Sequence, residues 1–272
     1  MIVALILVDS GTLIDARPAA LLESDGRTLI EIVTATVLRG PFGGTIVASP
    51  PAFSADVHTA LHGFAVQHVD APNKGGTHEP IIHALKAAAN FRQRWEKIRA
   101  AAATRFQDAD DEDEEKPKPA PHKSGAAAKA KADAKAQWGK HKQNPDVKVR
   151  GLARSFDRDG VALFRAEHPL VSLELQAQMV EAFAREAATK DDEARPFAQA
   201  LYEGRRGYPI LMSTDGAREV EGLAAATNFD DWLLENLRRV QDVAVQEAGA
   251  VEAVRSRADL DALRPKLLKR RA

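Results

Sequence analysis

Three polar residues, Ser10, Gly11 and Thr12, follow the apolar run 2–8 near the start of this chain. An unbroken Ile/Val/Leu run of this kind is typical of a buried central strand in a parallel sheet. Ligands bind such sheets at the carboxyl ends of the strands, so these residues stand where a phosphate-binding loop would lie. We therefore predict a phosphate contact here; the alternative is a turn that only ends the strand.

Two later clusters of polar residues are also candidates. Glu167 and His168 follow the apolar run 160–164 and form a polar pair at the end of a strand, either within a ligand site or in a structural turn. Arg205 and Arg206 lie between two glycines and predict a contact with an anion or a substrate. For these arginines, a solvated loop is the alternative.

Gly75 and Gly76 precede Thr77, which we expect to cap a long helix. The first backbone amides of a helix bind anions readily, so the two glycines could present those amides to a phosphate. An ordinary capped helix start is the alternative that the sequence favours. Lys74, in the same loop, could also approach a phosphate.

The elements that must position these residues alternate between strands and helices. The first 70 residues predict strands at 2–8, 45–49 and 64–69. A helix that Thr28 caps follows the first strand and ends at Leu38, and a short helix that starts with residues 54–58 follows the second. This order predicts a mostly parallel, Rossmann-like sheet with crossover helices. Later segments predict a strand near 160–165, a helix capped by Ser172, strands at 198–202, 210–212 and 240–245, and helices at 229–240 and from Ser256.

A charged segment divides the chain. All but one of residues 108–115 are Asp or Glu, and residues 116–142 alternate Lys with Ala and Pro. Such a composition cannot bury apolar surface, so we expect a disordered insertion, either a solvated spacer or a docking segment for a protein partner. The predicted organisation is an N-terminal nucleotide-binding half at 1–107, the insertion at 108–150, the C-terminal half of the same domain at 151–263, and a basic tail at 264–272.

The overall composition excludes several classes of protein. The net charge of −1 provides no basic field for nucleic acid, and the absence of cysteine excludes disulfides, thiolate catalysis and Cys-based metal sites. The apolar start is too short for a membrane span and lacks the basic residues of a signal peptide. We expect a cytoplasmic protein that binds neither membrane nor nucleic acid.

Three segments together resemble the MobA-like NTP transferases, the cytidylyltransferase and guanylyltransferase group of molybdenum-cofactor synthesis. The segments are Leu7–Leu22 followed by Asp25–Glu31, then Val161–Val171, and then Tyr202–Pro209. The resemblance implies a three-layer α/β/α sandwich of the nucleotide-diphospho-sugar transferase type. It also implies Mg²⁺-dependent transfer of a nucleotidyl group from an NTP to a small phosphorylated acceptor.

In that family the first segment wraps the triphosphate, and an arginine and a lysine neutralise its charge. In this chain Leu7, Pro18, Leu21 and Leu22 match the family pattern. The residues that differ stand at the positions of glycines and of the charged clamp: Ser10 and Ala16 at the glycines, Ile14 at the arginine and Ala19 at the lysine. Arg17 and Arg165 are the arginines that could replace the lost clamp.

The family binds magnesium through an aspartate in its second segment, where this chain has Glu167, a hard oxygen ligand suited to Mg²⁺. A second metal-binding aspartate of the family is replaced here by Arg255. The resemblance therefore implies a diverged nucleotidyltransferase, weakly active or a pseudoenzyme, in which Arg205 and Arg206 contact the acceptor. The alternative is a non-catalytic interaction protein that recruits a partner through residues 108–142.

Overall fold

The chain is described by a computed structural model, and it divides into two compact units, residues 1–94 with 154–272 and residues 95–153. The residues that the structure describes are 1–9, 13–72, 78–111, 159–188, 195–224 and 226–270. The predicted charged insertion at 108–150 lies almost wholly outside them. In the described residues, none of the helices has the length and apolarity needed to cross a bilayer.

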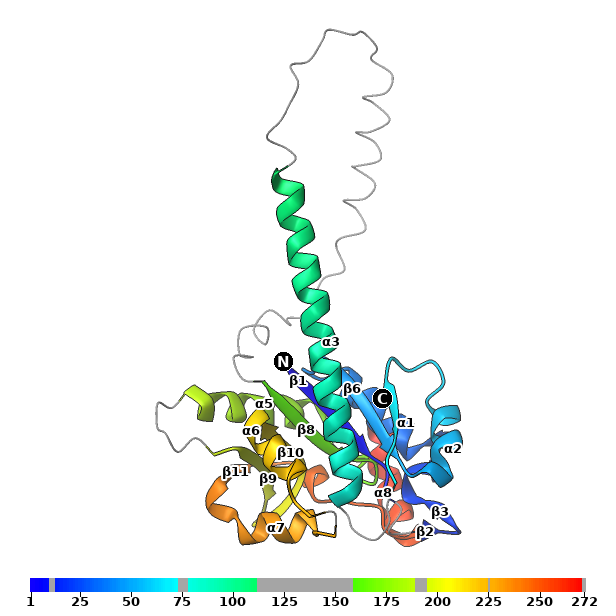
Figure 1. Cartoon of the computed structure of the whole chain (residues 1–272). Coiled ribbons are helices and arrows are strands. Elements are labelled where there is room, and N and C mark those ends of the chain that lie inside the picture. The colour runs from blue at the N-terminus through cyan, green and yellow to red at the C-terminus, as the bar shows by residue number, and fades with distance from the viewer. Residues whose placement is uncertain (10–12, 73–77, 112–158, 189–194, 225, 271–272) are drawn as a thin grey trace, which may run out of the picture. The chain divides into compact units, whose positions relative to one another are not determined.

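A seven-stranded sheet forms the centre of the first unit (Figure 1). All neighbouring strands are parallel except at β10, which runs antiparallel to both of its neighbours. The mostly parallel sheet predicted from the sequence is therefore confirmed. From one edge to the other the strands are β11 (Val240–Ala244), β9 (Phe197–Tyr202), β10 (Arg205–Ser213), β8 (Gly160–Arg165), β1 (Ile2–Leu7), β6 (Gly44–Ser49) and β7 (Gln67–Asp70).

The register of the two central strands positions the candidate site. Strand β1 is buried along its whole length, as its apolar sequence requires, and it pairs with β8 so that Leu7 lies opposite Arg165. Asp9 and Glu167 each follow these partners by two residues. Because the strands are parallel, both carboxylates leave the sheet at the same carboxyl edge.

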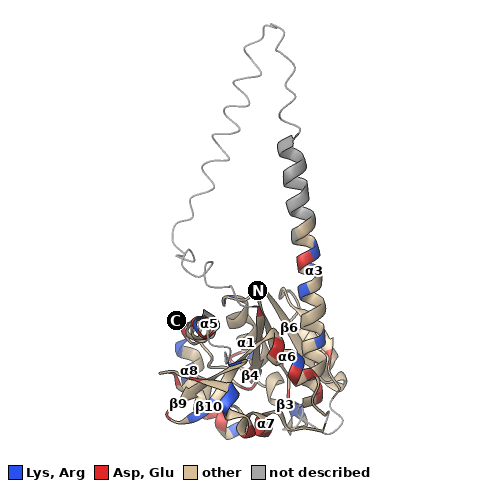
Figure 2. Ribbon diagram, turned by 60° about the vertical axis from the view of Figure 1, so that its left-hand side comes forward, with Lys and Arg blue, Asp and Glu red and all other residues tan. Residues whose placement is uncertain are grey.

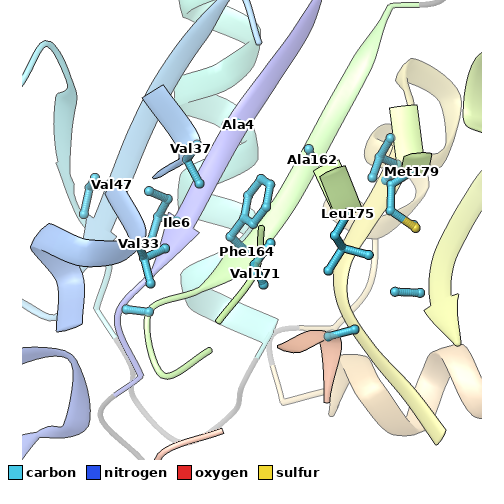
Figure 3. Packing of buried hydrophobic residues seen from close by; sticks show 14 of the residues in the cluster. Ala4, Ile6, Val33, Val37, Val47, Ala162, Phe164, Val171, Leu175 and Met179 are labelled. Atoms are coloured by element: carbon cyan, nitrogen blue, oxygen red, sulfur yellow. The ribbon is translucent and has the colours of Figure 1, made fainter. Parts of the chain in front are cut away.

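Helices cover both faces of the sheet, which gives the three layers that the resemblance implies (Figure 1). One face packs against α1 (Leu29–Leu38), α2 (Ser54–Ala60) and α5 (Leu173–Ala188). Figure 3 shows this layer, with Phe164 of the sheet beside apolar side chains from α1 and α5. The other face packs against the first turns of α3 (His78–Asp111), α6 (Thr214–Glu221) and α7 (Phe229–Glu235).

Two small hairpins that the sequence did not predict lie between β1 and α1. The first joins β2 (Leu13–Ile14) to β3 (Arg17–Pro18), and the second joins β4 (Glu23–Ser24) to β5 (Arg27–Thr28). Both two-residue turns have positive φ at each central residue, which matches the right-handed twist of the strands. The central residues of the second turn are Asp25 and Gly26.

A short 3-10 segment, Ala19–Leu21, follows the first hairpin, and the last helix, α8 (Arg257–Lys269), packs against the same region. Nine buried apolar residues form a hydrophobic cluster here, separate from the layers on the two faces of the sheet. Ile14 of the hairpin and Leu267 of α8 are among them. Part of the predicted basic tail at 264–272 is therefore helical and packed. An ion pair between Arg257 and Asp15 fixes the tip of the hairpin to the start of α8, with 2.8 Å between Nη2 and Oδ2.

Some of the predicted elements differ from those of the structure. The third strand begins at Gln67 rather than Phe64, and α6 was not predicted. Strand β10 begins at Arg205, so Arg205 and Arg206 lie in a strand rather than in a loop. The reason is that Glu203 and Gly204, both at positive φ, form a tight turn that pairs the arginines with β9 directly.

Candidate functional site at the carboxyl ends of β1 and β8

A cavity of about 130 Å³ opens at the carboxyl edge shared by β1 and β8, where the sequence predicted a ligand site. Polar and charged side chains from both halves of the chain line most of it, together with small residues after the first hairpin. The lining residues are Asp9, Ala19, Ala20, Arg165, Glu167, His168, Tyr208, Asp230, Ala253, Val254 and Arg255.

The guanidinium of Arg165 lies among three carboxylates. Its Nη2 is 3.0 Å from Oδ2 of Asp230, and its Nη1 is 3.4 Å from Oε1 of Glu167 and 3.8 Å from Oδ2 of Asp9. Only 12% of the Arg165 side chain is exposed, so the loss of hydration must be balanced by these partners. The arginine thus joins the ends of β1 and β8 to the start of α7.

Tyr208 completes this network from β10. Its hydroxyl accepts a hydrogen bond from Nε of Arg165 at 2.7 Å and donates one to Oδ1 of Asp230 at 2.8 Å. The pairing of β10 with β9 shifts between Gly207 and Ile210, and this bulge contains Tyr208. Bulges redirect side chains near functional sites, and this one lies where the tyrosine hydroxyl reaches across to β8.

The pKa values in the network follow from burial and from these contacts. Burial opposes the positive charge of Arg165, but Tyr208, Glu167 and Asp230 outweigh it and raise the pKa of the guanidinium above its ordinary value. Burial raises the pKa of Glu167, and the nearby Arg165 only partly offsets this effect. Burial also raises the pKa of the Tyr208 hydroxyl, so it remains a proton donor near neutral pH.

His168 is buried in the same wall, with 6% of its surface exposed. Burial, together with the charges of Arg165 and Arg255, lowers its pKa to about 3, so the imidazole is neutral near pH 7. Its ring packs against Tyr208 with 5.2 Å between centroids, and its Nδ1 atom is buried without a hydrogen-bond partner among the described residues. The wall of the cavity therefore holds a neutral, buried imidazole at this position.

These residues do not form the set that a magnesium ion requires. Mg²⁺ needs carboxylate oxygens that point toward one space in which the ion can lie. Here the guanidinium of Arg165 occupies the position between the carboxylates of Asp9, Glu167 and Asp230. Across the described ranges, no group of three His, Asp or Glu residues has the arrangement of a metal site. Arg255, which stands at the place of a metal-binding aspartate in the family, also lines the cavity and adds a second positive charge.

The structure places only some of the predicted phosphate contacts. Ser10, Gly11, Thr12, Gly75 and Gly76 lie outside the described residues, as does Lys74. Their predicted roles remain predictions.

The two residues of the first hairpin region that the sequence singled out lie in different places. Arg17 is exposed on β3 and does not line the cavity. Ala19, at the position of the family's lysine, does line it, and it is buried. The wall that would carry a phosphate-binding ammonium therefore carries a methyl group instead.

A second cavity, of about 400 Å³, shares four lining residues with the first. Arg205 and Arg206, the predicted acceptor contacts, both line it, together with Arg255. Arg206 forms two hydrogen bonds to Asp242 of β11, at 2.9 and 2.7 Å, so its charge is already paired. The four shared residues are His168, Tyr208, Asp230 and Arg255.

Tyr208 and Asp230 are the site residues that the sequence did not reveal. Asp230 lies in the first turn of α7, where an acidic residue is common for helix stability alone, and Asn228 caps that helix through its side chain. Tyr208 was within the predicted Tyr202–Pro209 motif, but nothing in its spacing indicated a contact with Arg165. Both contacts connect residues far apart in the sequence.

No family model matches this sequence, and no curated protein matches it. Solved structures do match, and the three described here are similar to this chain over nearly the full length of both chains. A nucleotidyl transferase from Methanothermobacter thermautotroptrophicus is 14% identical with a TM-score of 0.57, covering 98% of each chain.

A homologue of Mycobacterium tuberculosis Rv0371c, from a Mycobacterium species, strain JC1, is 16% identical with a TM-score of 0.56, covering 98% of this chain and 97% of that one. The 4-diphosphocytidyl-2C-methyl-D-erythritol synthase of Anaerococcus prevotii is 12% identical with a TM-score of 0.56, covering 98% and 96%. The shared feature is the fold: this chain has the nucleotide-diphospho-sugar transferase fold of nucleotidyltransferases.

Proposed function

We propose that this chain is a diverged MobA-like nucleotidyltransferase that binds a nucleoside triphosphate at the carboxyl ends of β1 and β8 but transfers its nucleotidyl group weakly or not at all. The observation that carries the proposal is the position of Arg165. Its guanidinium lies among Asp9, Glu167 and Asp230, so the carboxylates that could hold a metal are instead paired with a cation of the chain itself.

The chemistry explains why this arrangement weakens transfer. Nucleotidyl transfer is an in-line displacement at the α-phosphorus with pyrophosphate leaving, and a protein contributes mainly positioning and neutralisation of charge. Arg165 provides little of that neutralisation, because three carboxylates already surround it. Ala19 provides none. Since losing one stabilising donor typically lowers the rate about 10²–10³-fold, efficient turnover is not expected.

The remaining residues still suit the binding of a nucleotide. The cavity combines the neutral imidazole of His168 in its wall with the positive charge of Arg255 beside it. Burial of Tyr208 and Glu167 around the Arg165 guanidinium makes this wall rigid before a ligand arrives. A rigid wall lowers the entropy that binding must overcome.

The test combines binding with turnover. Thermal shifts of the full chain with each of the four NTPs, with and without Mg²⁺, should show stabilisation by at least one NTP, since a ligand at about 100 times its Kd adds roughly 2.7 kcal/mol. Pyrophosphate release should stay near background. The proposal of weak or absent transfer would be overturned by efficient pyrophosphate release that is abolished by Glu167→Gln. The exposed control Glu181→Gln should leave such release intact. No shift with any NTP would overturn nucleotide binding.

A second candidate function is recruitment of a protein partner through residues 108–142. It is supported by the opposite charges of the two halves of this segment. Deleting 108–142 should remove capture of the partner while the melting temperature stays nearly unchanged. A large fall in melting temperature would show that the segment is structural.

A further inference from the structure

A third cavity, separate from the two described above, lies where α1, α8 and the second hairpin meet. It is a groove of about 110 Å³, and none of its lining residues lines either of those two cavities. Helix α1 contributes Ile32, Ala35 and Thr36, and Arg39 follows its last turn. The helical repeat places these four positions on one face. The groove therefore lies outside the site proposed for the nucleotide.

Three arginines line this groove, each from a different element. Arg27 belongs to β5, Arg39 follows α1 and Arg270 follows α8. Asp25 is the one acidic residue among the described residues of the lining, which leaves a net formal charge of +2. Figure 2 marks the lysines and arginines of α8 in blue, and Lys269 adds to the positive charge of its last turn. The groove therefore favours an anion.

The carboxylates of the described residues leave much of this charge unbalanced. Arg27 donates a hydrogen bond from Nη2 to the backbone carbonyl of Glu31 at 3.4 Å, and within the described ranges neither Arg27 nor Arg39 forms an ion pair. Arg270 pairs with Glu247, with 3.4 Å between Nη2 and Oε2. Burial nevertheless lowers the pKa of the Arg270 guanidinium, because the nearby glutamates only partly offset the loss of hydration. An anion in the groove would supply the missing negative charge.

The positive charges are spread along the groove rather than gathered at one point. The Arg27 guanidinium lies beside the carbonyl oxygen of Glu31, in the first turn of α1, whereas Arg39 lies just beyond the last turn. The helix rises about 12 Å between residues 31 and 39. A ligand with one anionic group therefore suits one of these arginines, whereas a ligand with an anionic group at each end suits both.

Apolar side chains line the groove between these charges. Ile32 and Ala35 lie between the two arginines along α1, and Leu267, Leu268 and Pro169 complete the apolar lining. Leu268 is 45% exposed, which is high for a leucine. A hydrocarbon chain placed here would remove this surface from water and be stabilised by the hydrophobic effect. The groove thus combines an apolar centre with cationic ends.

We propose that this groove binds a linear dicarboxylate with an apolar chain, one carboxylate on Arg27, the other on Arg39 and the chain against Leu268. The planar guanidinium of arginine matches a carboxylate through two parallel hydrogen bonds. With C–C bonds of about 1.5 Å, an extended chain of about eight carbons spans roughly 9 Å. Hydrogen bonds of about 2.8 Å at each end cover the remaining distance.

The test is isothermal titration calorimetry of the full chain with suberate. Octanoate has the same chain with a single carboxylate, succinate has both carboxylates on a shorter chain, and inorganic phosphate has no chain. Suberate should bind about tenfold more tightly than any of these, and Arg27→Gln and Arg39→Gln should each remove that advantage. Leu268→Ser should weaken suberate but not succinate. Arg185→Gln, an equal change of charge on α5, and Arg255→Gln, in the other two cavities, should leave suberate binding unchanged.

Three outcomes would overturn the proposal. They are no binding of suberate, binding of octanoate or phosphate as tight as that of suberate, and a loss with Arg255→Gln as large as with Arg39→Gln. The last result would place the ligand in a cavity that Arg255 lines. Circular dichroism of each variant checks its folding, and the comparison of probes on the unaltered chain needs no variant. Since no probe is a nucleotide, failure of NTP binding would leave this result standing.

Discussion

Arg165 and Tyr208 form a hydrogen bond of 2.7 Å between the guanidinium Nε and the phenolic oxygen, and the guanidinium carbon also lies 5.1 Å from the centre of the tyrosine ring. The two residues lie on neighbouring antiparallel strands, yet the pairing of those strands begins only at Ile210. The contact thus joins β8 and β10 through their side chains where their backbone pairing has ended. It fixes the wall between the two cavities.

Arg165→Met should lower the free energy of unfolding by about 3 kcal/mol or more. The substitution leaves Glu167 buried beside Asp9 without the cation that balances them, and removing one partner of a buried ion pair typically costs about 3–5 kcal/mol. Urea denaturation of the full chain measures the change. Arg185→Met, at an exposed i,i+4 pair on α5, is the matched control and should cost less than about 1 kcal/mol. Equal effects of the two substitutions would contradict a structural role for Arg165.

His168 should make the folded state less stable as the pH falls. Its pKa is lowered to about 3 in the folded state, so below about pH 6.5 the unfolded chain takes up a proton that the folded chain does not. Stability is therefore lost between about pH 6.5 and pH 3, with a limiting slope of about 1.4 kcal/mol per pH unit.

The comparison of His168→Asn with the unaltered chain isolates this effect. His68 and His78 also have lowered pKa values, but they contribute equally to both proteins. Urea titrations at pH 7 and pH 5 should show a loss for the unaltered chain that exceeds the loss for the variant by roughly 2 kcal/mol. If the two losses were the same, the pKa of His168 would not differ between the folded and unfolded states.

Much of the fold follows from local sequence signals. The apolar run 2–8 predicts β1 because a strand buried on both faces needs no polar residues, and Thr28 predicts the start of α1 because its hydroxyl can cap the helix. The order of strands and helices then predicts a parallel sheet. These signals are carried by neighbouring residues, so they can be recognised without the three-dimensional structure.

The site could be predicted only in part, because its contacts join residues that are far apart in the sequence. Asp9 and Glu167 could be placed at one edge, since both follow parallel strands. Tyr208 and Asp230 are 43 and 65 residues from Arg165, and their approach depends on the bulge in β10 and on how α7 packs. A side chain redirected by tertiary packing leaves no periodic pattern in the sequence.

The capping box of α1 can be tested directly. The hydroxyl of Thr28 accepts from the backbone N–H of Glu31, and the carboxylate of Glu31 accepts from the backbone N–H of Thr28 at 2.6 Å. Thr28→Ala should lower the free energy of unfolding by about 1 kcal/mol, whereas Thr28→Ser should restore most of it. Chemical denaturation gives both values. Equal stability of the alanine and serine variants would show that the cap contributes little.

Ala16→Gly should stabilise the protein, the opposite of the usual effect of glycine. Ala16 occupies the left-handed region at φ 62, where a side chain clashes with its own backbone at a cost of about 1–2 kcal/mol. The residue is exposed, so no packing is lost. Relief of the strain, reduced by the extra freedom of glycine in the unfolded chain, should raise the free energy of unfolding by about 0.5–1 kcal/mol. Ala177→Gly, within α5, should instead lower it by about 1 kcal/mol, and the same sign for both variants would contradict the strained turn.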